Sequence, residues 1–374
     1  MKIAVIGSGI VGASIAYHLA KKGAEVVIVD DGREGRATNA GAGIVFPWDK
    51  TRGNDWFAIA KAGTLYYSTL IAELKDLGET DVGFKKAGAL LVSPDMEQQA
   101  KKQKLLESRR KEIPEIGDVV RLSYREARNL FPLLHPDLHA VYVSSGYRVD
   151  GNLLWGALER AGQEYGVILK NGNAALLLEN GNVKGVIVNR EKIYADIVVV
   201  AAGAWAPDII HPLGMKLMIE PQRGQIIHIK LDEQDTSNWP IILPDNDYYL
   251  LAFDDHRVVA GATRETNSGF DYRVTVGGVQ EVISEALSMA PGLKEGTLHE
   301  IRIGFRPMAS DGLPLLGRLG PYSNVLIAAG TGPYGLTMGP YIGKLAAEIV
   351  MDRKTEIDLS PYDPMRAVEV LEEV

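Results

Sequence analysis

The sequence predicts an α/β protein of two domains, one built on a parallel sheet and one of α+β structure with an antiparallel sheet. A short apolar run at residues 2–6 leads into a glycine-rich turn and then into a helical pattern. A second apolar run, at residues 196–205, ends in small residues, which is typical of a buried parallel strand that meets a ligand. Residues 220–304 are rich in short apolar and alternating runs, which indicate an antiparallel sheet. The length of 374 residues agrees with two domains.

The first thirty residues follow the order strand, glycine turn, helix, strand, acid. In the GxGxxG turn, Gly7 allows a tight bend, Gly9 lets the backbone approach a pyrophosphate, and Gly12 lets helix and strand pack closely. The helix start then offers free N–H groups and a positive dipole end to phosphate oxygens. Asp30 closes the second strand, where it can accept from a ribose hydroxyl and disfavours a phosphorylated ribose. This pattern predicts a dinucleotide site and leaves NAD and FAD both open.

The composition excludes several classes of partner and site. The net charge of −8 gives no reason to expect nucleic acid. Because the chain has no cysteine, disulfides, thiolate metal sites and a thioether-linked flavin are excluded. His135 and His139 are four residues apart, but Pro132 and Pro136 disfavour the helix that a metal pair would need, so no metal is expected. We also expect a cytoplasmic protein without an integral membrane segment, because no secretory signal and no apolar run of roughly 18 residues is present.

The other elements follow from periodicity, capping residues and turn residues. Ser123 and Glu126 form a capping box before a short helix, and Asp150 caps another helix. Asn-Gly pairs at 171–172 and 180–181 mark turns between short strands. Predicted helices cover residues 13–22, 54–77, 94–111, 152–165, 277–290 and 338–352, and predicted strands cover residues 25–29, 84–93, 138–144, 167–169, 174–178, 183–188, 225–229, 248–253, 258–262 and 324–329.

Six motifs in the same order resemble the FAD-dependent D-amino-acid oxidase family, and within it the bacterial glycine oxidases. The resemblance covers nearly the whole chain. The glycine corner near the C-terminus, which an NAD dehydrogenase would not need, favours FAD over NAD. The motifs are Gly7 to Gly12 with Ala16 and Gly23, Asp30, the Arg36-to-Ile44 loop, the Val198-to-Trp205 strand, Gly304-Phe305-Arg306-Pro307, and Gly330 to Thr337.

The resemblance implies a D-amino-acid oxidase or glutathione-reductase-like architecture, with a Rossmann-type FAD-binding domain and an α+β substrate domain. Residues 1–80, 150–218 and 305–374 are expected to form the FAD-binding domain, and residues 81–149 and 219–304 the substrate domain. The flavin is expected to be non-covalent. The residues implied to bind it are Gly7, Gly9, Ile10, Val11, Gly12, Asp30, Asp31, Arg36, Thr38, Asn39, Ala42, Gly43, Ile44, Ala175, Ala202, Gly203, Trp205, Arg306, Gly330, Gly332, Pro333, Tyr334, Gly335, Leu336 and Thr337.

The resemblance also implies a substrate site. The family binds the substrate carboxylate with an arginine at the position of Arg306, and a guanidinium grips a carboxylate with two parallel hydrogen bonds. Tyr249 matches a tyrosine that lines the pocket, and Tyr248 would face the other way unless the register slips by one residue. Arg306 and Tyr249 are therefore the implied catalytic residues, with Tyr334 and Arg264 as further substrate-binding residues.

Two positions depart from the glycine oxidases, and they leave the substrate open. Pro333 stands where those enzymes tend to carry a second arginine, and Arg264 stands where they are usually apolar. The implied reaction is oxidative deamination of a small amino acid (glycine, sarcosine or a small D-amino acid) to a keto acid, ammonia and hydrogen peroxide. The alternatives are a D-amino-acid or secondary-amine dehydrogenase with an acceptor other than molecular oxygen, and a non-catalytic flavoprotein subunit. A homo-oligomer is a further option, because related enzymes are commonly dimers or tetramers.

Overall fold

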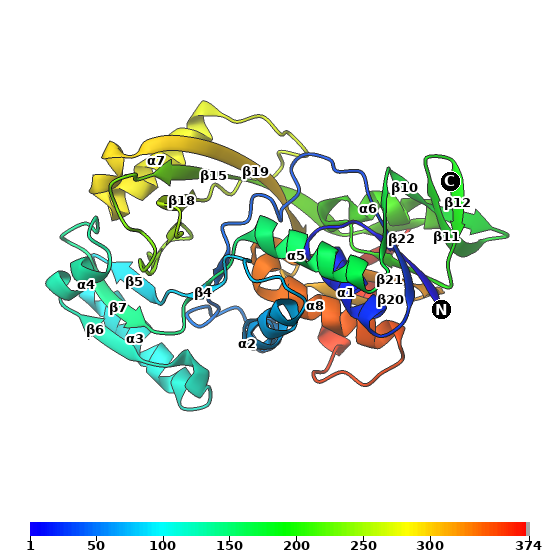
Figure 1. The fold of residues 1–374 in the computed structure, drawn as a ribbon, viewed down its shortest axis with the longest axis horizontal. Helices are drawn as coiled ribbons and strands as arrows, with labels where there is room; N and C mark the ends of the chain where they lie inside the picture. Colours follow the sequence, from blue (N-terminus) through cyan, green and yellow to red (C-terminus); the bar gives the residue numbers. More distant parts are fainter. Residues whose placement is uncertain (372–374) are drawn as a thin grey trace.

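The computed structural model describes residues 1–371 and builds them around two large sheets (Figure 1). In the first sheet five strands run parallel and β20 lies antiparallel at one edge. Because β1 lies between β13 and β2, the glycine turn and the end of the second apolar run meet at the carboxyl edge of the sheet, where such sheets bind ligands. The strands in spatial order are β20 (Leu315–Leu319), β21 (Tyr322–Ala329), β13 (Ile197–Val200), β1 (Lys2–Ile6), β2 (Glu25–Asp30) and β9 (Ile168–Asn171).

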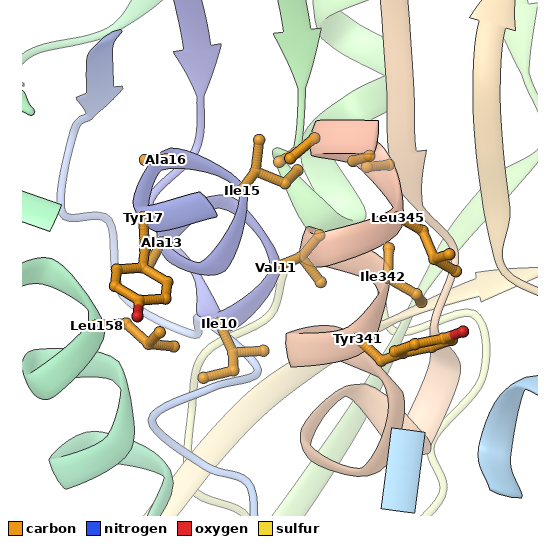
Figure 2. Close-up of a cluster of buried hydrophobic side chains, with 14 of the residues drawn as sticks. Ile10, Val11, Ala13, Ile15, Ala16, Tyr17, Leu158, Tyr341, Ile342 and Leu345 are labelled. Carbon is orange, nitrogen blue, oxygen red and sulfur yellow. The ribbon is translucent and has the colours of Figure 1, made fainter. Parts of the chain in front are cut away.

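Helices cover this sheet; α5 and α8 pack closely on α1, whereas the short α6 packs with the core on the other face (Figures 1 and 2). Figure 2 shows Val11 directed toward α8 and Tyr17 directed toward Leu158 of α5. Glycines of α8 permit the approach: a Cβ on Gly343 would lie 2.3 Å from the Ser14 Oγ atom. These helices are α1 (Ile10–Lys21), α2 (Asn54–Asp76), α5 (Gly151–Glu164), the short α6 (Ala206–Ile210) and α8 (Gly335–Val350).

A proline inside α8 is compensated by side chains of neighbouring helices. Pro340 has no N–H to donate to the carbonyl of Leu336 one turn earlier. The Tyr67 hydroxyl of α2 donates to that carbonyl instead, and the Ser14 hydroxyl of α1 donates to the Pro340 carbonyl over 2.8 Å. The start of α8 is therefore fixed against α1 and α2, at the edge of the sheet that carries the glycine turn.

The second large sheet is antiparallel except for the parallel pair of β16 and β5. Helices α3 (Met96–Arg110), α4 (Tyr124–Leu130) and α7 (Val276–Met289) pack beside its strands, and the predicted capping box of α4 is present. Its strands in spatial order are β19 (Thr297–Ala309), β15 (Ile219–Lys230), β18 (Arg257–Gly261), β17 (Tyr249–Ala252), β16 (Ile241–Leu243), β5 (Ala89–Ser93), β7 (His139–Val143) and β6 (Val119–Leu122).

The predicted fold class is confirmed. The strand expected at 225–229 is longer, because β15 begins at Ile219, and the long strand β19 was not predicted. The continuous strand expected at 84–93 is two strands, because Gly88 has a φ of 75° and turns the chain out of one sheet into another. The division into domains stays a prediction, and β19 crosses its boundary at 304–305. The small sheets are β3 (Ile44–Val45) with β8 (Tyr147–Arg148) and β4 (Lys85–Lys86), β10 (Ala174–Glu179) with β11 (Asn182–Val188) and β12 (Glu191–Tyr194), and β14 (Met215–Leu217) with β22 (Val368–Val370).

Within residues 1–371, no helix combines the length and the apolar character needed to cross a membrane.

Candidate active site

One cavity of about 590 Å³ is lined by residues of both large sheets. This volume lies within the range of pockets that bind cofactors and small molecules. Its lining residues fall into two groups. The nucleotide side comprises the turn after β1, the end of β2, the loop at 31–44, the start of β10, the turn after β13 and residues 331–337. The sheet side comprises residues of β15, β16, β17 and β19, the loops beside them, and Phe46 and Lys50.

The glycine turn after β1 forms a phosphate cradle, by which we mean Gly7, Gly9, Ile10 and Val11. Gly7 has a φ of 96°, which favours glycine, and all four residues line the cavity. Gly9 is the N-cap residue of α1 and has no side chain that could accept from the first turn of the helix. Instead, the Thr38 Oγ1 atom accepts from the Ile10 N–H over 3.0 Å. The remaining free N–H groups of the first turn, together with the helix dipole, suit a phosphate.

Asp30 is held in place beside the cradle. Its two carboxylate oxygens accept from the backbone N–H groups of Ser8 and Gly32, each over 2.7 Å, and Arg36 lies 3.3 Å away. The Oδ1 atom accepts from both Gly32 and Arg36, whereas the Oδ2 atom accepts only from Ser8 and keeps a second lone pair, so Asp30 can still accept from a ribose hydroxyl. The Ser8 hydroxyl donates to Glu159 of α5, a residue that the sequence analysis did not predict and for which no motif gave a signal. Burial raises the pKa of Glu159.

Small residues let other backbone segments reach the same space. Gly43 has a φ of 103°, and a Cβ there would lie 1.8 Å from the Val149 carbonyl oxygen. A Cβ on Gly41 would lie 2.7 Å from Leu336 at the start of α8. Predicted cofactor residues that line the cavity outside the cradle are Asp30, Asp31, Arg36, Thr38, Ala42, Gly43, Ile44, Ala175, Ala202, Gly203, Trp205, Arg306, Gly332, Pro333, Tyr334, Gly335, Leu336 and Thr337.

Three predicted cofactor residues, Gly12, Asn39 and Gly330, do not line the cavity. Gly12 instead faces the turn itself, where a Cβ would lie 1.9 Å from the Gly7 carbonyl oxygen. The carbonyl of Asn39 accepts from the Arg302 Nη1 atom over 3.2 Å, and Gly330 has a φ of 72° in the turn before α8. These residues shape the turns that line the site, and their role in binding the cofactor stays a prediction.

Arg306 is the central cation of the sheet side. Its Nη1 atom donates to the Gln222 Oε1 atom over 3.1 Å and to the Thr263 carbonyl over 2.9 Å. Within residues 1–371 it forms no ion pair with a carboxylate, and burial lowers the pKa of its guanidinium. A half-buried cation without a counter-ion is unfavourable, so this arrangement suits a ligand that brings an anion.

Tyr249 lies beside Arg306, and both Tyr249 and its neighbour Tyr248 line the cavity, so the expectation that Tyr248 faces away from it stays a prediction. The Tyr249 ring lies over Gly261 of the neighbouring strand, where a Cβ would be 2.5 Å from the hydroxyl. Tyr248 belongs to the apolar cluster beside α7, and its hydroxyl donates to Glu281. Burial raises the pKa of Tyr249 to about 12, opposed in part by the charges of Arg306 and Arg264, so the phenol stays protonated and can donate.

Further charged residues of the cavity include two that the sequence analysis did not predict. Lys50 lines the cavity and lies 3.2 Å from Asp49; burial lowers its pKa, but the charges of Asp49, Tyr334 and Asp247 raise it overall. Asp247 lines the cavity from the loop between β16 and β17 and pairs with Arg264 over 3.1 Å. Neither residue belongs to a motif, so no local signal pointed to them. Among residues 1–371, no group of three or more histidine, aspartate or glutamate side chains could hold a metal ion.

A substitution at Gly224 tests whether the position of the Arg306 guanidinium is important for substrate binding. A Cβ on Gly224 would lie 2.6 Å from the Arg306 Nη2 atom, so Gly224→Ala should displace the movable guanidinium rather than the backbone. We expect KM for the substrate to rise by about tenfold or more, the equivalent of about 1.4 kcal/mol, with flavin content unchanged. The matched control is Gly277→Ala in α7, whose added methyl would meet nothing within 4 Å. An unchanged KM would show that the position of this guanidinium is not important for substrate binding.

The parallel sheet, the phosphate cradle and the aspartate at the end of β2 define a dinucleotide-dependent oxidoreductase, and comparisons with known proteins identify the family. Residues 2–349 match the family described as FAD dependent oxidoreductase, and the chain belongs to it. The predicted FAD-dependent enzyme, similar to the D-amino-acid oxidase family and to glycine oxidases, is confirmed. The cradle, the uncapped helix start and Asp30 fit the adenine dinucleotide of FAD.

Three similar proteins cover almost the whole chain. The uncharacterized oxidoreductase YurR of Bacillus subtilis (strain 168) is 44% identical over 366 residues, which cover 97% of this chain and 98% of YurR. The crystal structure of iminodiacetate oxidase (IdaA) from Chelativorans sp. BNC1 matches with a TM-score of 0.94 and 45% identity, over 97% of this chain and 98% of that one. The crystal structure of glycine oxidase from Geobacillus kaustophilus matches with a TM-score of 0.85 and 25% identity, over 100% of this chain and 98% of that one.

Proposed function

We propose that this protein is an FAD-dependent oxidase of small amino acids, including N-substituted glycines, whose carboxylate binds Arg306. The observation that carries the proposal is a deep-lying guanidinium on the cavity wall whose two hydrogen-bond partners, Gln222 and the Thr263 carbonyl, are both uncharged. A substrate carboxylate would supply the missing negative charge and two strong acceptors. The names of similar proteins, glycine oxidase and iminodiacetate oxidase, support a substrate with a carboxylate next to a C–N bond.

The chain's own residues orient the substrate. Arg306 and the protonated phenol of Tyr249 would donate to the carboxylate, which fixes the direction of the neighbouring α-carbon. The cradle, Asp30 and residues 332–337 would hold FAD, and bound FAD supplies the acceptor for the α-hydrogen and its electron pair. The substrate C–N bond becomes an imine, which water hydrolyses to a keto acid and an amine or ammonia. Among residues 1–371, Asp247 is the carboxylate that lines the sheet side, and it is paired with Arg264, so we assign no side-chain base.

The test is anaerobic addition of glycine, sarcosine, iminodiacetate and small D-amino acids to the purified yellow protein, followed by admission of air. We expect one or more of these compounds to bleach the flavin absorption band, and air to restore it with formation of hydrogen peroxide. Bleaching that air restores only slowly would instead support the dehydrogenase with another acceptor. A flavin band that none of the compounds changes would contradict the proposal and support the non-catalytic flavoprotein subunit.

A further inference from the structure

Arg264 is a second arginine of the cavity, and the proposed function gives it no role. It follows β18, and its side chain is 31% exposed. One Nη2 contact, 3.1 Å to the Asp247 Oδ1 atom, is its only ion pair within residues 1–371. Its Nε atom is buried and has no hydrogen-bond partner among these residues. Because a buried N–H group normally has a partner, this side chain has capacity for an additional acceptor.

The charges around the sheet side are not balanced without a ligand. Arg306, Arg264 and Lys50 line the cavity as cations. Asp247 pairs with Arg264 and Asp49 pairs with Lys50, so among the described residues Arg306 is the one of the three without a carboxylate partner. The charge of Arg264 contributes to lowering the pKa of Arg306, which shows that the two guanidinium groups are close enough to repel each other. A single substrate carboxylate on Arg306 would neutralise that guanidinium and would leave Arg264 with Asp247 as its counter-ion.

The loop that carries Asp247 is fastened at the two residues that precede it. Asp245 pairs with Lys102 over 2.7 Å, and the Asn246 Nδ2 atom donates to Glu285 over 2.9 Å. The Asp247 side chain itself is 53% exposed, so it can turn toward water without disturbing its neighbours. Its exposed pairing with Arg264 is therefore weak and easily exchanged for another carboxylate.

We propose that Arg264 binds a second carboxylate of the substrate, so that the enzyme selects amino acids with two acid groups. This inference rests on the proposed function, in which the first carboxylate lies on Arg306. Asp247 is the counter-ion of Arg264 in the free enzyme and is displaced by the incoming carboxylate, while Lys50 adds positive charge to the same part of the cavity. The second carboxylate is carried either on the nitrogen substituent, as in iminodiacetate, or on the side chain, as in D-aspartate.

Pairs of compounds that differ only in the second carboxylate test the inference. Iminodiacetate is compared with N-ethylglycine, and D-aspartate with D-2-aminobutyrate, in anaerobic flavin reduction by the holoenzyme. For one pair, the wild type should prefer the diacid by about a hundredfold or more in kcat/KM, as expected for a charge-assisted contact. The pair that shows the preference identifies which arm carries the second carboxylate. Reduction of the flavin without any preference for diacids would overturn the inference and leave the proposed function intact, whereas no reduction by any compound would overturn both.

Substitutions of Arg264 and Asp247 test whether the preference for the diacid depends on Arg264. Arg264→Met should reduce the preference for the diacid to less than about fivefold, because kcat/KM for the diacid falls much more than kcat/KM for N-ethylglycine or D-2-aminobutyrate, and Arg264→Lys should keep part of the preference. Asp247→Asn should bind the diacid more tightly. The matched control is Arg318→Met, because the Arg318 side chain is 32% exposed, pairs with Asp352 and lies outside the cavity. Equal losses for both members of a pair in Arg264→Met would overturn the inference.

Unreactive ligands give a readout that is independent of turnover. Glutarate and butyrate differ by one carboxylate, and their binding is followed through the flavin absorption spectrum of the holoenzyme. We expect glutarate to bind at least about tenfold more tightly than butyrate to the wild type and about equally to Arg264→Met. Equal affinities in the wild type would contradict a second carboxylate site.

Discussion

Replacing Arg306 by methionine should lower kcat/KM for every amino-acid substrate by about a hundredfold or more, the largest effect that we expect of any substitution on the sheet side. Methionine keeps much of the apolar stem but removes the guanidinium, so the substrate carboxylate loses its charged partner and its fixed orientation. Gln222 and the Thr263 carbonyl also lose the donor that they now share. The measurement is anaerobic reduction of the flavin at several substrate concentrations, which separates weaker binding from slower reduction.

Two further variants test whether the expected loss of activity is due to the guanidinium of Arg306. Arg306→Lys keeps the charge but not the planar pair of donors, so it should recover only part of the activity. Arg302→Met is the matched control, because Arg302 lies four residues away on β19, is about as enclosed and does not line the cavity. Flavin content should be unchanged in all three variants. Activity of Arg306→Met within a few-fold of the wild type would show that the carboxylate binds elsewhere.

The sequence was sufficient for the nucleotide side because its determinants are local. The turn that runs from Gly7 to Gly12 and the acid at Asp30 lie within one strand–helix–strand unit, and parallel pairing of β1 with β2 brings them together. The unpredicted Glu159 shows the limit of that reasoning. It reaches Ser8 only because α5 packs on α1, and nothing in the local sequence encodes that contact.

The sheet side depends on pairings between distant segments. Gln222 lies opposite Arg306 because β15 pairs with β19, and the two residues are 84 positions apart. Asp247 and Lys50 reach the cavity from loops whose positions follow from the whole sheet. Arg306 and Tyr249 could be predicted only from a family motif, whereas the partners that hold or neutralise the cations needed the structure.

The split of the predicted strand at 84–93 has a different cause. The run is apolar throughout most of its length, so its periodicity gives no reason for a break. Gly88 was the visible signal, because a glycine inside a strand pattern marks a bend or a close approach. A Cβ there would lie 2.6 Å from the ring of Tyr142, so both its φ and its surroundings require glycine.

Gly12→Ala should abolish FAD binding, although Gly12 does not line the cavity. A Cβ on Gly12 would lie 1.9 Å from the Gly7 carbonyl oxygen and 3.4 Å from the Ala201 Cβ atom. The first of these is a backbone atom of the cradle, so the overlap can be relieved only if α1 moves away from the turn. The N–H groups of the first helical turn then no longer point at the space that the pyrophosphate needs.

The measurements for Gly12→Ala are the ratio of flavin to protein absorbance after purification and the melting temperature with and without added FAD. A ligand that binds the folded state raises the melting temperature, so added FAD should stabilise wild-type apoprotein but not the variant. Gly156→Ala in α5 is the matched control, because its added methyl meets only the movable end of Arg160. If Gly12→Ala purified with a full complement of FAD, the close approach of α1 to the turn after β1 would not be what positions the cofactor.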